Sequence, residues 1–422
     1  MDVEVRPTAG RSKGAGELEA ISTTCVIAGG GPAGMMCGFL LARAGVDVTV
    51  LEKHKDFLRD FRGDTVHPST LEIMRQLGLL EDFLKLPHSC IRTANLVIGD
   101  QHLIIGDFAR LPTACKFIAL MPQWDFLDFL AGHAKKLPSF RLLMETEATD
   151  LITQDRRICG VEATSQGRDI QIKAALTIAA DGRHSVLRDK SGLRVEDLGA
   201  PFDVLWLRLP ILPGDPVDLV GRVKGGQLFV MIYRNDYWQC AYLIPKGGFD
   251  TIKAEGLSRF RARLKEIADF AAGRVDGAIT DFDQVKLLTV TVDRLTRWAR
   301  PGLLCIGDAA HAMSPIGGVG INLAIQDAVA AANFLAPVLQ KRAPELRDLE
   351  RVQQRREFPT RVIQALQVAA QNRLLAPTLA SNRTPTPPFI FRLLNDWPWL
   401  RQFPARIIGL GVRPEHVRLQ QS

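Results

Sequence analysis

Gly29-Gly30-Gly31-Pro32-Ala33-Gly34 is a glycine-rich turn between two apolar stretches, residues 24–28 and 35–44. The first stretch has the length of a buried strand and the second that of a helix. The turn therefore has the strand–turn–helix setting that the G-x-G-x-x-G spacing requires. In that setting the first glycine permits a tight turn, the second lets backbone approach a pyrophosphate, and the third lets helix and strand pack closely. The stretch predicts a dinucleotide-binding site.

An acidic residue follows the next expected strand. Residues 46–51 are apolar, and Glu52 comes directly after them, about 20 residues beyond the turn. A carboxylate at this place accepts hydrogen bonds from an adenosine ribose and repels a 2′-phosphate. The site is therefore predicted to bind FAD or NAD rather than NADP, with Glu52 and the adjacent Lys53 as candidate contacts.

A second glycine-rich turn stands near the end of the chain. Gly307-Asp308-Ala309-Ala310-His311 follows a strand-like stretch, residues 303–306, and precedes a helical pattern over residues 320–339. A strand, a turn and a helix start present N–H groups and a positive dipole end to an anion. His311 stands among alanines and is interpreted as a packed, hydrogen-bonded histidine rather than a catalytic base. Together the two turns favour a flavin enzyme.

Composition narrows the class further. With 422 residues, 46% of them hydrophobic, the chain can bury the cores of two domains. The net charge of +7 is spread along the chain, which suits anionic cofactors and is weak evidence for nucleic acid. The seven cysteines include no C-x-x-C pair, so we expect reduced thiols in a cytoplasmic protein and neither a disulfide nor a metal framework. Residues 1–20 are polar and are expected to be a disordered extension.

The order of expected elements indicates an α/β protein with an interrupted nucleotide-binding domain. Helices are expected at residues 68–77, 122–136 and 255–271, and strands within residues 91–118, 142–178, 202–245 and 285–293. We assign residues 21–90, 121–200 and 294–385 to a discontinuous FAD-binding domain. Residues 91–120 and 201–293 are assigned to a β-rich substrate domain inserted into it. Residues 386–422 are expected to form a helical, basic C-terminal segment.

These motifs resemble those of the single-component (group A) FAD-dependent monooxygenases, the family of aromatic hydroxylases such as p-hydroxybenzoate hydroxylase. The resemblance covers roughly residues 22–413. Besides the two glycine turns and Glu52 it rests on Asp181-Gly182-Arg183-His184-Ser185-Val186-Leu187-Arg188. This segment is similar to the family's D-G-x-x-S-x-x-R motif, which serves both FAD and the nicotinamide cofactor. The resemblance implies a Rossmann-like FAD-binding domain with an inserted β-rich substrate domain.

The resemblance also implies roles for single residues. Arg62 corresponds to the arginine that lies against the flavin, Gln123 to a glutamine near its ribityl or phosphate groups, and Asp308 to the acid that binds the ribityl chain or ribose. Pro315, Gly318 and Asn322 correspond to the segment beside the isoalloxazine ring. The candidate cofactor-binding residues are Gly29, Gly31, Pro32, Ala33, Gly34, Glu52, Lys53, Arg62, Gln123, Asp181, Asp308, Gly318 and Asn322. The candidate catalytic residues are Arg62, Pro315, His67 and Tyr233, the last two as acceptors of a phenolic proton.

The implied activity is hydroxylation of an aromatic or other electron-rich small molecule. NADPH or NADH reduces FAD, O2 is trapped as a C4a-hydroperoxyflavin, and one oxygen atom passes to the substrate while the other leaves as water. The single G-x-G-x-x-G turn fits a family in which the nicotinamide cofactor docks without a Rossmann unit of its own. The alternatives are a flavin-dependent reductase similar to the polyprenyl reductases, a flavin-dependent halogenase and a non-catalytic flavin sensor. A monomer or homodimer is expected, with no nucleic-acid partner.

The substrate is expected between the flavin and the inserted sheet. Phe229, Met231 and Tyr233 share one face of an expected strand, and Trp238, Cys240 and Tyr242 share a face of the next. Either set is a candidate lining of the cavity or is simply sheet core. Trp206 and Arg208, on another strand, are further candidates. We expect a C-terminal helix that docks on the protein itself, in preference to a peripheral membrane contact, because prolines and arginines interrupt residues 386–413.

Overall fold

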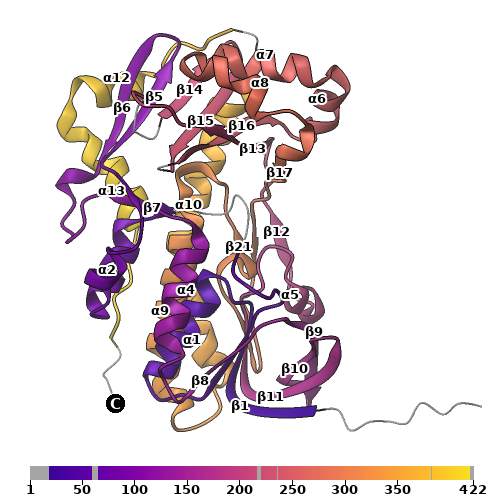
Figure 1. Ribbon diagram of the computed structural model, residues 1–422. Coiled ribbons are helices and arrows are strands. Elements are labelled where there is room, and N and C mark those ends of the chain that lie inside the picture. The colour runs from indigo at the N-terminus through magenta and orange to yellow at the C-terminus, as the bar shows by residue number, and fades with distance from the viewer. Residues whose placement is uncertain (1–18, 59–64, 216–219, 235, 382, 419–422) are drawn as a thin grey trace, which may run out of the picture.

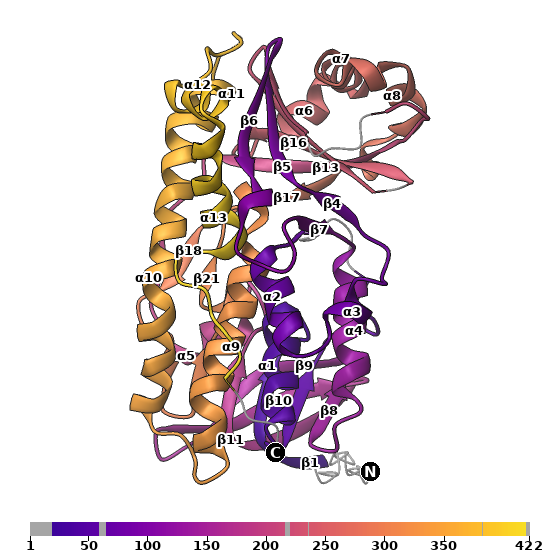
Figure 2. The ribbon, with the colours of Figure 1, turned by 90° about the vertical axis from the view of Figure 1, so that its left-hand side faces the viewer.

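The computed structural model describes residues 19–58, 65–215, 220–234, 236–381 and 383–418. One sheet lies in the lower half of the molecule and another in the upper half (Figure 1). The helix α10 (Leu346–Ala370) runs along both halves (Figure 2). The mixed α/β architecture expected from the order of elements is confirmed.

The lower sheet has a parallel centre. The strand order is β20-β11-β1-β2-β8, and antiparallel strands extend this sheet at β19, β10 and β9. Its strands are β1 (Glu19–Ala28), β2 (Val48–Leu51), β8 (Phe140–Leu143), β9 (Thr146–Gln154), β10 (Arg157–Ser165), β11 (Arg168–Ala179), β19 (Ala299–Arg300) and β20 (Leu303–Cys305). Because β1 begins at Glu19, residues 19 and 20 belong to the sheet and not to the expected N-terminal extension. Residues 1–18 lie outside the described residues.

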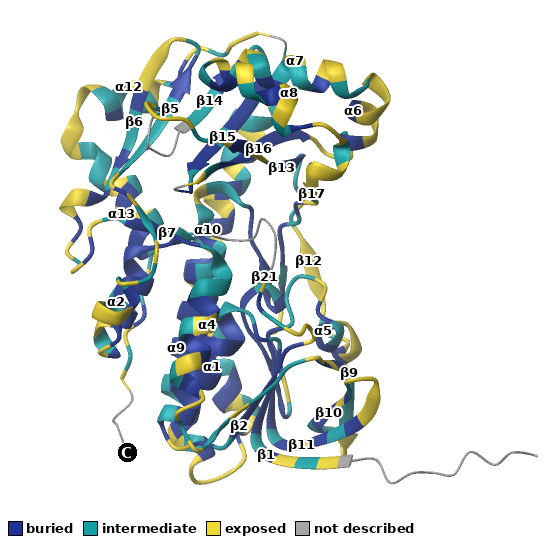
Figure 3. Cartoon of the chain, in the orientation of Figure 1, coloured by how far each residue is buried: buried dark blue, intermediate teal, exposed yellow. Residues whose placement is uncertain are grey.

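Buried helices pack on this sheet in a common hydrophobic core. They are α1 (Pro32–Arg43), α4 (Gln123–Ala134) and α9 (Gly320–Leu339). The bounds of α9 are those that its apolar pattern predicts. In the described part of the chain, Ile316–Leu339 is the single helix with the length and composition of a membrane span, and it is mostly buried inside the protein. Its apolar character is therefore accounted for by the core (Figure 3).

The upper sheet combines strands from two parts of the chain. Its order is β17-β13-β16-β15-β14-β5-β6. These strands are β5 (Thr93–Ile98), β6 (Gln101–Asp107), β13 (Phe202–Pro210), β14 (Val220–Lys224), β15 (Gln227–Tyr233), β16 (Tyr237–Pro245) and β17 (Lys286–Leu288). The strands β15 and β16 pair antiparallel from Tyr233 opposite Trp238, which confirms the expected hairpin.

Short helices cover one face of the upper sheet. They are α6 (Phe249–Glu255), α7 (Leu257–Ile267), α8 (Val275–Ala278), and the 3-10 turns η2 (Asp269–Arg274) and η3 (Phe282–Gln284). The helix expected over residues 255–271 is confirmed as α7, with its bounds shorter than expected. Gly256, with φ of +92°, ends α6 and starts α7, a backbone conformation that L side chains rarely adopt.

Smaller elements connect the two halves. Two three-stranded sheets contain β12 (Val195–Asp197), β18 (Asp293–Leu295) and β21 (His311–Ala312), and β3 (Thr65–Val66), β7 (Ile118–Leu120) and β4 (Ser89–Ile91). The remaining helical elements are α2 (Pro68–Gln76), α3 (Leu80–Phe83), η1 (Phe108–Arg110), α5 (Val186–Ser191), η4 (Gly307–Ala309), η5 (Ile316–Gly318), η6 (Gln371–Leu375), α11 (Ala376–Leu379), α12 (Phe389–Asp396), η7 (Pro398–Arg401) and α13 (Gln402–Leu410). The C-terminal segment is helical, and α13 packs on β6, η1 and α2 of the same chain.

Candidate functional site

Three turns meet at the carboxyl ends of three adjacent parallel strands. Ala28 at the end of β1 lies beside Ala179 of β11, and Ala179 lies beside Cys305 of β20. The N–H of Ala180 donates to Ala28 O (2.8 Å), and the N–H of Ile306 donates to Ala179 O (3.0 Å). The turns that begin at Gly29, Asp181 and Gly307 therefore share one edge of the sheet. Ligands of open parallel sheets bind at such an edge.

The first turn is packed against protein at Gly29 and Gly34 and is open at Gly31. A Cβ on Gly29 would lie 2.3 Å from Ala180 O, and a Cβ on Gly34 would lie 1.9 Å from Gly29 O. A Cβ on Gly31 would meet no atom within 4 Å. Gly31 caps the N-terminus of α1, whose first-turn amides have no acceptor within the helix. The backbone here can approach a pyrophosphate, as the sequence predicts.

Glu52 is buried beside the same turn, with 7% of its surface exposed. Its Oε2 accepts the N–H of Gly30 (3.2 Å), and its Oε1 lies 2.7 Å from His54 Nδ1. These contacts hold the carboxylate at the edge where an adenosine ribose is expected. Lys53 is exposed and pairs with Glu147 at 3.4 Å, so its role as a cofactor contact stays a prediction.

The second and third turns place charges of opposite sign together. Arg183 Nη2 lies 3.5 Å from Asp308 Oδ2, and each side chain is about one-third exposed (29% and 31%). Asp181 is instead directed to the start of α5, where Ser185 Oγ and the N–H of Leu187 donate to its carboxylate. Burial raises the pKa of Asp181. Asp308 and Arg183 form a pair that remains accessible to a ligand, and the contacts of Asp181 and Asp308 with FAD stay predictions.

The segment from Pro315 to Asn322 is held by a set of polar contacts. Asn322 Oδ1 accepts the N–H of His67 (2.9 Å) and the hydroxyl of Thr70 (2.7 Å). Its Nδ2 donates to Thr65 O (3.2 Å), and Gly318 O accepts the hydroxyl of Thr65 (2.8 Å). The Asn322 amide is thus engaged by the protein itself. Its direct contact with flavin, and those of Pro315 and Gly318, stay predictions.

His67 lies beneath the C-terminal helix. Its side chain is fully buried, and its Nδ1 lies 2.8 Å from Ile408 O, an arrangement in which the ring donates to that carbonyl. Burial lowers the pKa of His67 to about 4, although the Ile408 hydrogen bond opposes this shift. A neutral, buried imidazole of low basicity is a poor acceptor for a phenolic proton. The geometry favours a role in holding α13 onto α2.

The residues expected as either cavity lining or sheet core pack against the helices that cover the upper sheet. Phe229, Met231, Trp238, Cys240 and Tyr242 pack with α6, α7 and α8 in one cluster. Tyr233 packs against the same cluster and makes an edge contact with the Trp238 ring at 5.6 Å. These contacts agree with the second of the two interpretations, that these side chains form sheet core, and the proposed catalytic role of Tyr233 stays a prediction. A sheet has two faces, and the sequence of its strands does not show which face the helices α6 to α8 cover.

The opposite face of the upper sheet packs toward the segment that begins at Pro315. Trp206, Val230, Ala241 and Leu243 belong to a cluster that also contains Ile316, the residue after Pro315. Trp206, one of the sequence candidates, therefore lies on the face of the sheet that packs toward Ile316. Arg208 on the same strand stacks over the Tyr237 ring at 4.6 Å.

Two further candidates complete the comparison with the sequence. Gln123 is the first residue of α4 and is half-buried, and its contact with flavin stays a prediction. Arg62 lies outside the described residues.

The sequence interpretation missed a buried group of charged residues next to the turn that begins at Gly307. Asp327 on α9 accepts the N–H of Gly307 (3.1 Å), lies 2.6 Å from His311 Nε2 and accepts from Arg356 Nε (3.0 Å). This confirms His311 as a packed, hydrogen-bonded residue. The signal was available, because a single acid inside the apolar stretch 320–339 requires a buried partner.

Comparison with known proteins identifies a family of FAD-binding proteins, which agrees with a dinucleotide site at this sheet edge. The family model described as "FAD binding domain" matches residues 22–366. The 6-methylpretetramide 4-monooxygenase of Streptomyces rimosus is 32% identical over 362 residues, which cover 85% of each chain. The para-nitrophenol 4-monooxygenase of Pseudomonas sp. (strain WBC-3) is 25% identical over 338 residues, covering 75% of this chain and 79% of the relative.

A solved structure shows the same fold. The p-nitrophenol 4-monooxygenase of Pseudomonas putida DLL-E4 superposes with a TM-score of 0.74 at 21% identity, and the match covers 92% of this chain and 97% of that one. The inserted sheet and the parallel sheet therefore occur together in both molecules.

Proposed function

The chain belongs to the FAD-binding family of flavoprotein monooxygenases, and from that membership we propose what it hydroxylates and how its own residues serve the reaction. It is an FAD-dependent monooxygenase of aromatic compounds, with NAD(P)H as co-substrate. We propose an aromatic or polycyclic substrate, held between the Trp206 face of the upper sheet and the segment at Pro315. The apolar character of that face supports the proposal.

The observation that carries the proposal is the meeting of the three turns at one sheet edge. The open position at Gly31 and the accessible pair Asp308–Arg183 suit a dinucleotide, because backbone amides can bind its phosphates and the acid can bind its hydroxyl groups. Bound FAD would supply the redox chemistry, taking two electrons from NAD(P)H and delivering them to O2. One oxygen atom then enters the substrate and the other leaves as water.

The residues of this chain would provide binding and exclusion of water. The Gly31 turn would hold the pyrophosphate, and Asp308 the ribityl chain or ribose. Asn322 would keep the Gly318 turn against Thr65, which fixes the backbone beside the flavin ring. Ile316 and the Trp206 face of the sheet would close an apolar site. Exclusion of water from such a site prevents side reactions of reactive intermediates.

We also propose that the protein acts in the cytoplasm. All seven cysteines are free, and Cys25, Cys37, Cys115, Cys240 and Cys305 are buried. Burial raises the pKa of Cys37 to about 12, so this thiol stays protonated and unreactive.

The test is substrate-dependent oxygen consumption by the FAD-loaded protein, with NADPH and NADH compared, across phenols, nitrophenols and polycyclic phenols. We expect at least one compound to speed flavin reduction and to yield a product heavier by one oxygen atom. Flavin reduction with no compound-coupled oxygen uptake would instead indicate a reductase, and chloride- or bromide-dependent product would indicate a halogenase.

A further inference from the structure

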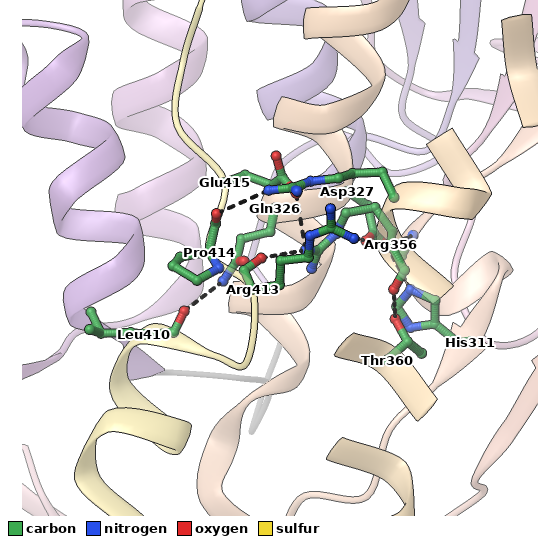
Figure 4. Close-up of polar contacts among 11 residues, drawn as sticks. His311, Gln326, Asp327, Arg356, Thr360, Leu410, Arg413, Pro414 and Glu415 are labelled. Carbon is green, nitrogen blue, oxygen red and sulfur yellow. Dashed lines mark hydrogen bonds and ion pairs between the residues drawn. The ribbon is translucent and has the colours of Figure 1, made fainter. Parts of the chain in front are cut away.

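A buried row of charges joins the C-terminal tail, residues 411–418, to the turn that begins at Gly307. Figure 4 shows Glu415, Arg356, Asp327 and His311 lying one after another between the tail, α10 and α9. Arg356 and Asp327 have fully buried side chains, and the Glu415 side chain is 4% exposed. The row therefore lies inside the protein, where each charge depends on its neighbour.

The tail end of the row is anchored by two arginines. Glu415 Oε1 accepts from Arg355 Nε (2.5 Å) and lies 3.4 Å from Arg356 Nη1. Arg356 Nη1 also donates to the carbonyl of Arg413 (3.1 Å). The tail thus gives Arg356 both a counter-charge and a backbone acceptor.

The other end of the row holds the turn that carries Asp308. Arg356 Nε donates to Asp327 Oδ1, which leaves Oδ2 for the N–H of Gly307 and the His311 ring. Burial by itself would raise the pKa of Asp327, but the adjacent His311 and Arg356 hold it below its ordinary value. One carboxylate oxygen of Asp327 therefore contacts both Gly307, directly before Asp308, and His311, three residues after it.

This turn has little freedom to tolerate displacement. Gly307 has φ of +60°, and a Cβ there would lie 3.0 Å from the Ala33 side chain at the start of α1. A shift of Gly307 would therefore change its fit against the first cofactor turn as well as the position of Asp308.

We propose that Glu415 is a positioning residue for FAD, acting through Arg356 and Asp327 on the Gly307–Asp308 turn. The C-terminal tail is then part of the cofactor site, although Glu415 itself lies behind it. Removing one partner of a buried ion pair is destabilising in itself, and in some proteins buried ionic groups also specify geometry. An effect on cofactor binding larger than the effect on stability is the consequence that distinguishes this role.

The experiment compares Glu415→Gln with Asp348→Asn in the full-length protein. Asp348 is a matched control, because it is a nearly buried acid near the start of α10, paired with Arg342 at 2.8 Å and without a contact to the Gly307–Asp308 turn. Glutamine keeps the size and the acceptor oxygen of Glu415 and removes its charge. The measured quantities are the FAD dissociation constant, from flavin fluorescence, and the melting temperature of the FAD-free protein.

We expect Glu415→Gln to weaken FAD binding ~10-fold, since a charged acceptor binds arginine more strongly than the neutral amide that replaces it by about that factor. Asp348→Asn should leave FAD binding unchanged while lowering the melting temperature. Arg355→Gln, a milder change that keeps the Arg356 contact, should weaken FAD binding about threefold or less. Unchanged FAD binding in Glu415→Gln, or an equal loss in Asp348→Asn, would overturn the proposal. Wild-type FAD binding in the same titration tests the cofactor site separately.

Discussion

Replacing Gly31 by alanine separates cofactor binding from folding. Gly31 has φ of −74° and ψ of −176°, which alanine adopts without strain, and its Cβ would meet no protein atom within 4 Å. Alanine is a poorer helix N-cap than glycine but loses less chain entropy on folding, so stability should change by roughly 1 kcal/mol or less. The added methyl group would project into the space that a pyrophosphate needs.

The expected loss follows from the contacts that the methyl group prevents. If two backbone N–H groups can no longer reach phosphate oxygens, each contact removes about 1.5 kcal/mol, so FAD should bind ~10²-fold more weakly. The assay is titration of the FAD-free protein with FAD, followed by flavin fluorescence, beside a thermal melt of the FAD-free form.

Gly34→Ala provides the contrast within the same turn. Its Cβ would lie 1.9 Å from Gly29 O, so the FAD-free protein should lose about 1–3 kcal/mol or more of folding stability through overpacking. A Gly31→Ala protein with wild-type FAD affinity would refute the assignment of this turn to the pyrophosphate. A Gly34→Ala protein with an unchanged melting temperature would refute the packing argument.

The remaining predictions concern the upper sheet. Val230→Trp, on the face that packs toward Ile316, should raise the KM for the aromatic substrate. Met231→Ala, on the helix-covered face, should cost about 2–5 kcal/mol of stability and leave KM unchanged. Steady-state kinetics measures KM, and denaturant unfolding measures the stability of both variants. A hydrogen bond from Arg274 lowers the pKa of Asp215 from 3.8 to about 2. A carboxyl group with a depressed pKa in the folded state stabilises the protein above its unfolded pKa, so this stability should be lost as pH falls from about 4 to about 2. Asp215→Asn should flatten that part of the pH–stability curve, and an unchanged curve would show that the ion pair contributes nothing.

Local sequence patterns are sufficient to predict much of the fold. The turn at Gly29 and the helix α9 are predicted from glycine spacing and apolar pattern, because both depend on interactions within a few tens of residues. The strand β20 and the turn at Gly307 are predicted for the same reason. The family and its FAD cofactor follow from these local motifs.

Other features depend on which surfaces meet in three dimensions. The alternation of β15 and β16 defines two faces, but only the packing of α6 to α8 shows that Phe229 and Tyr233 lie on the face covered by helices, opposite the face that packs on Ile316. Gly256, with φ of +92°, separates α6 from α7, so the helix begins two residues later than the sequence pattern predicts.

By itself the sequence determined that a strand, a glycine turn and a helix occur twice in forms that suit a flavin nucleotide, because phosphate-binding turns require particular residues at particular spacings. Only the tertiary structure decided that Glu415 reaches Arg356 and that Asp327 connects both to Gly307. Such ion pairs have no local sequence signature, since any arginine can neutralise any buried acid. The packing of α9, α10 and the C-terminal tail determines which arginine contacts which acid.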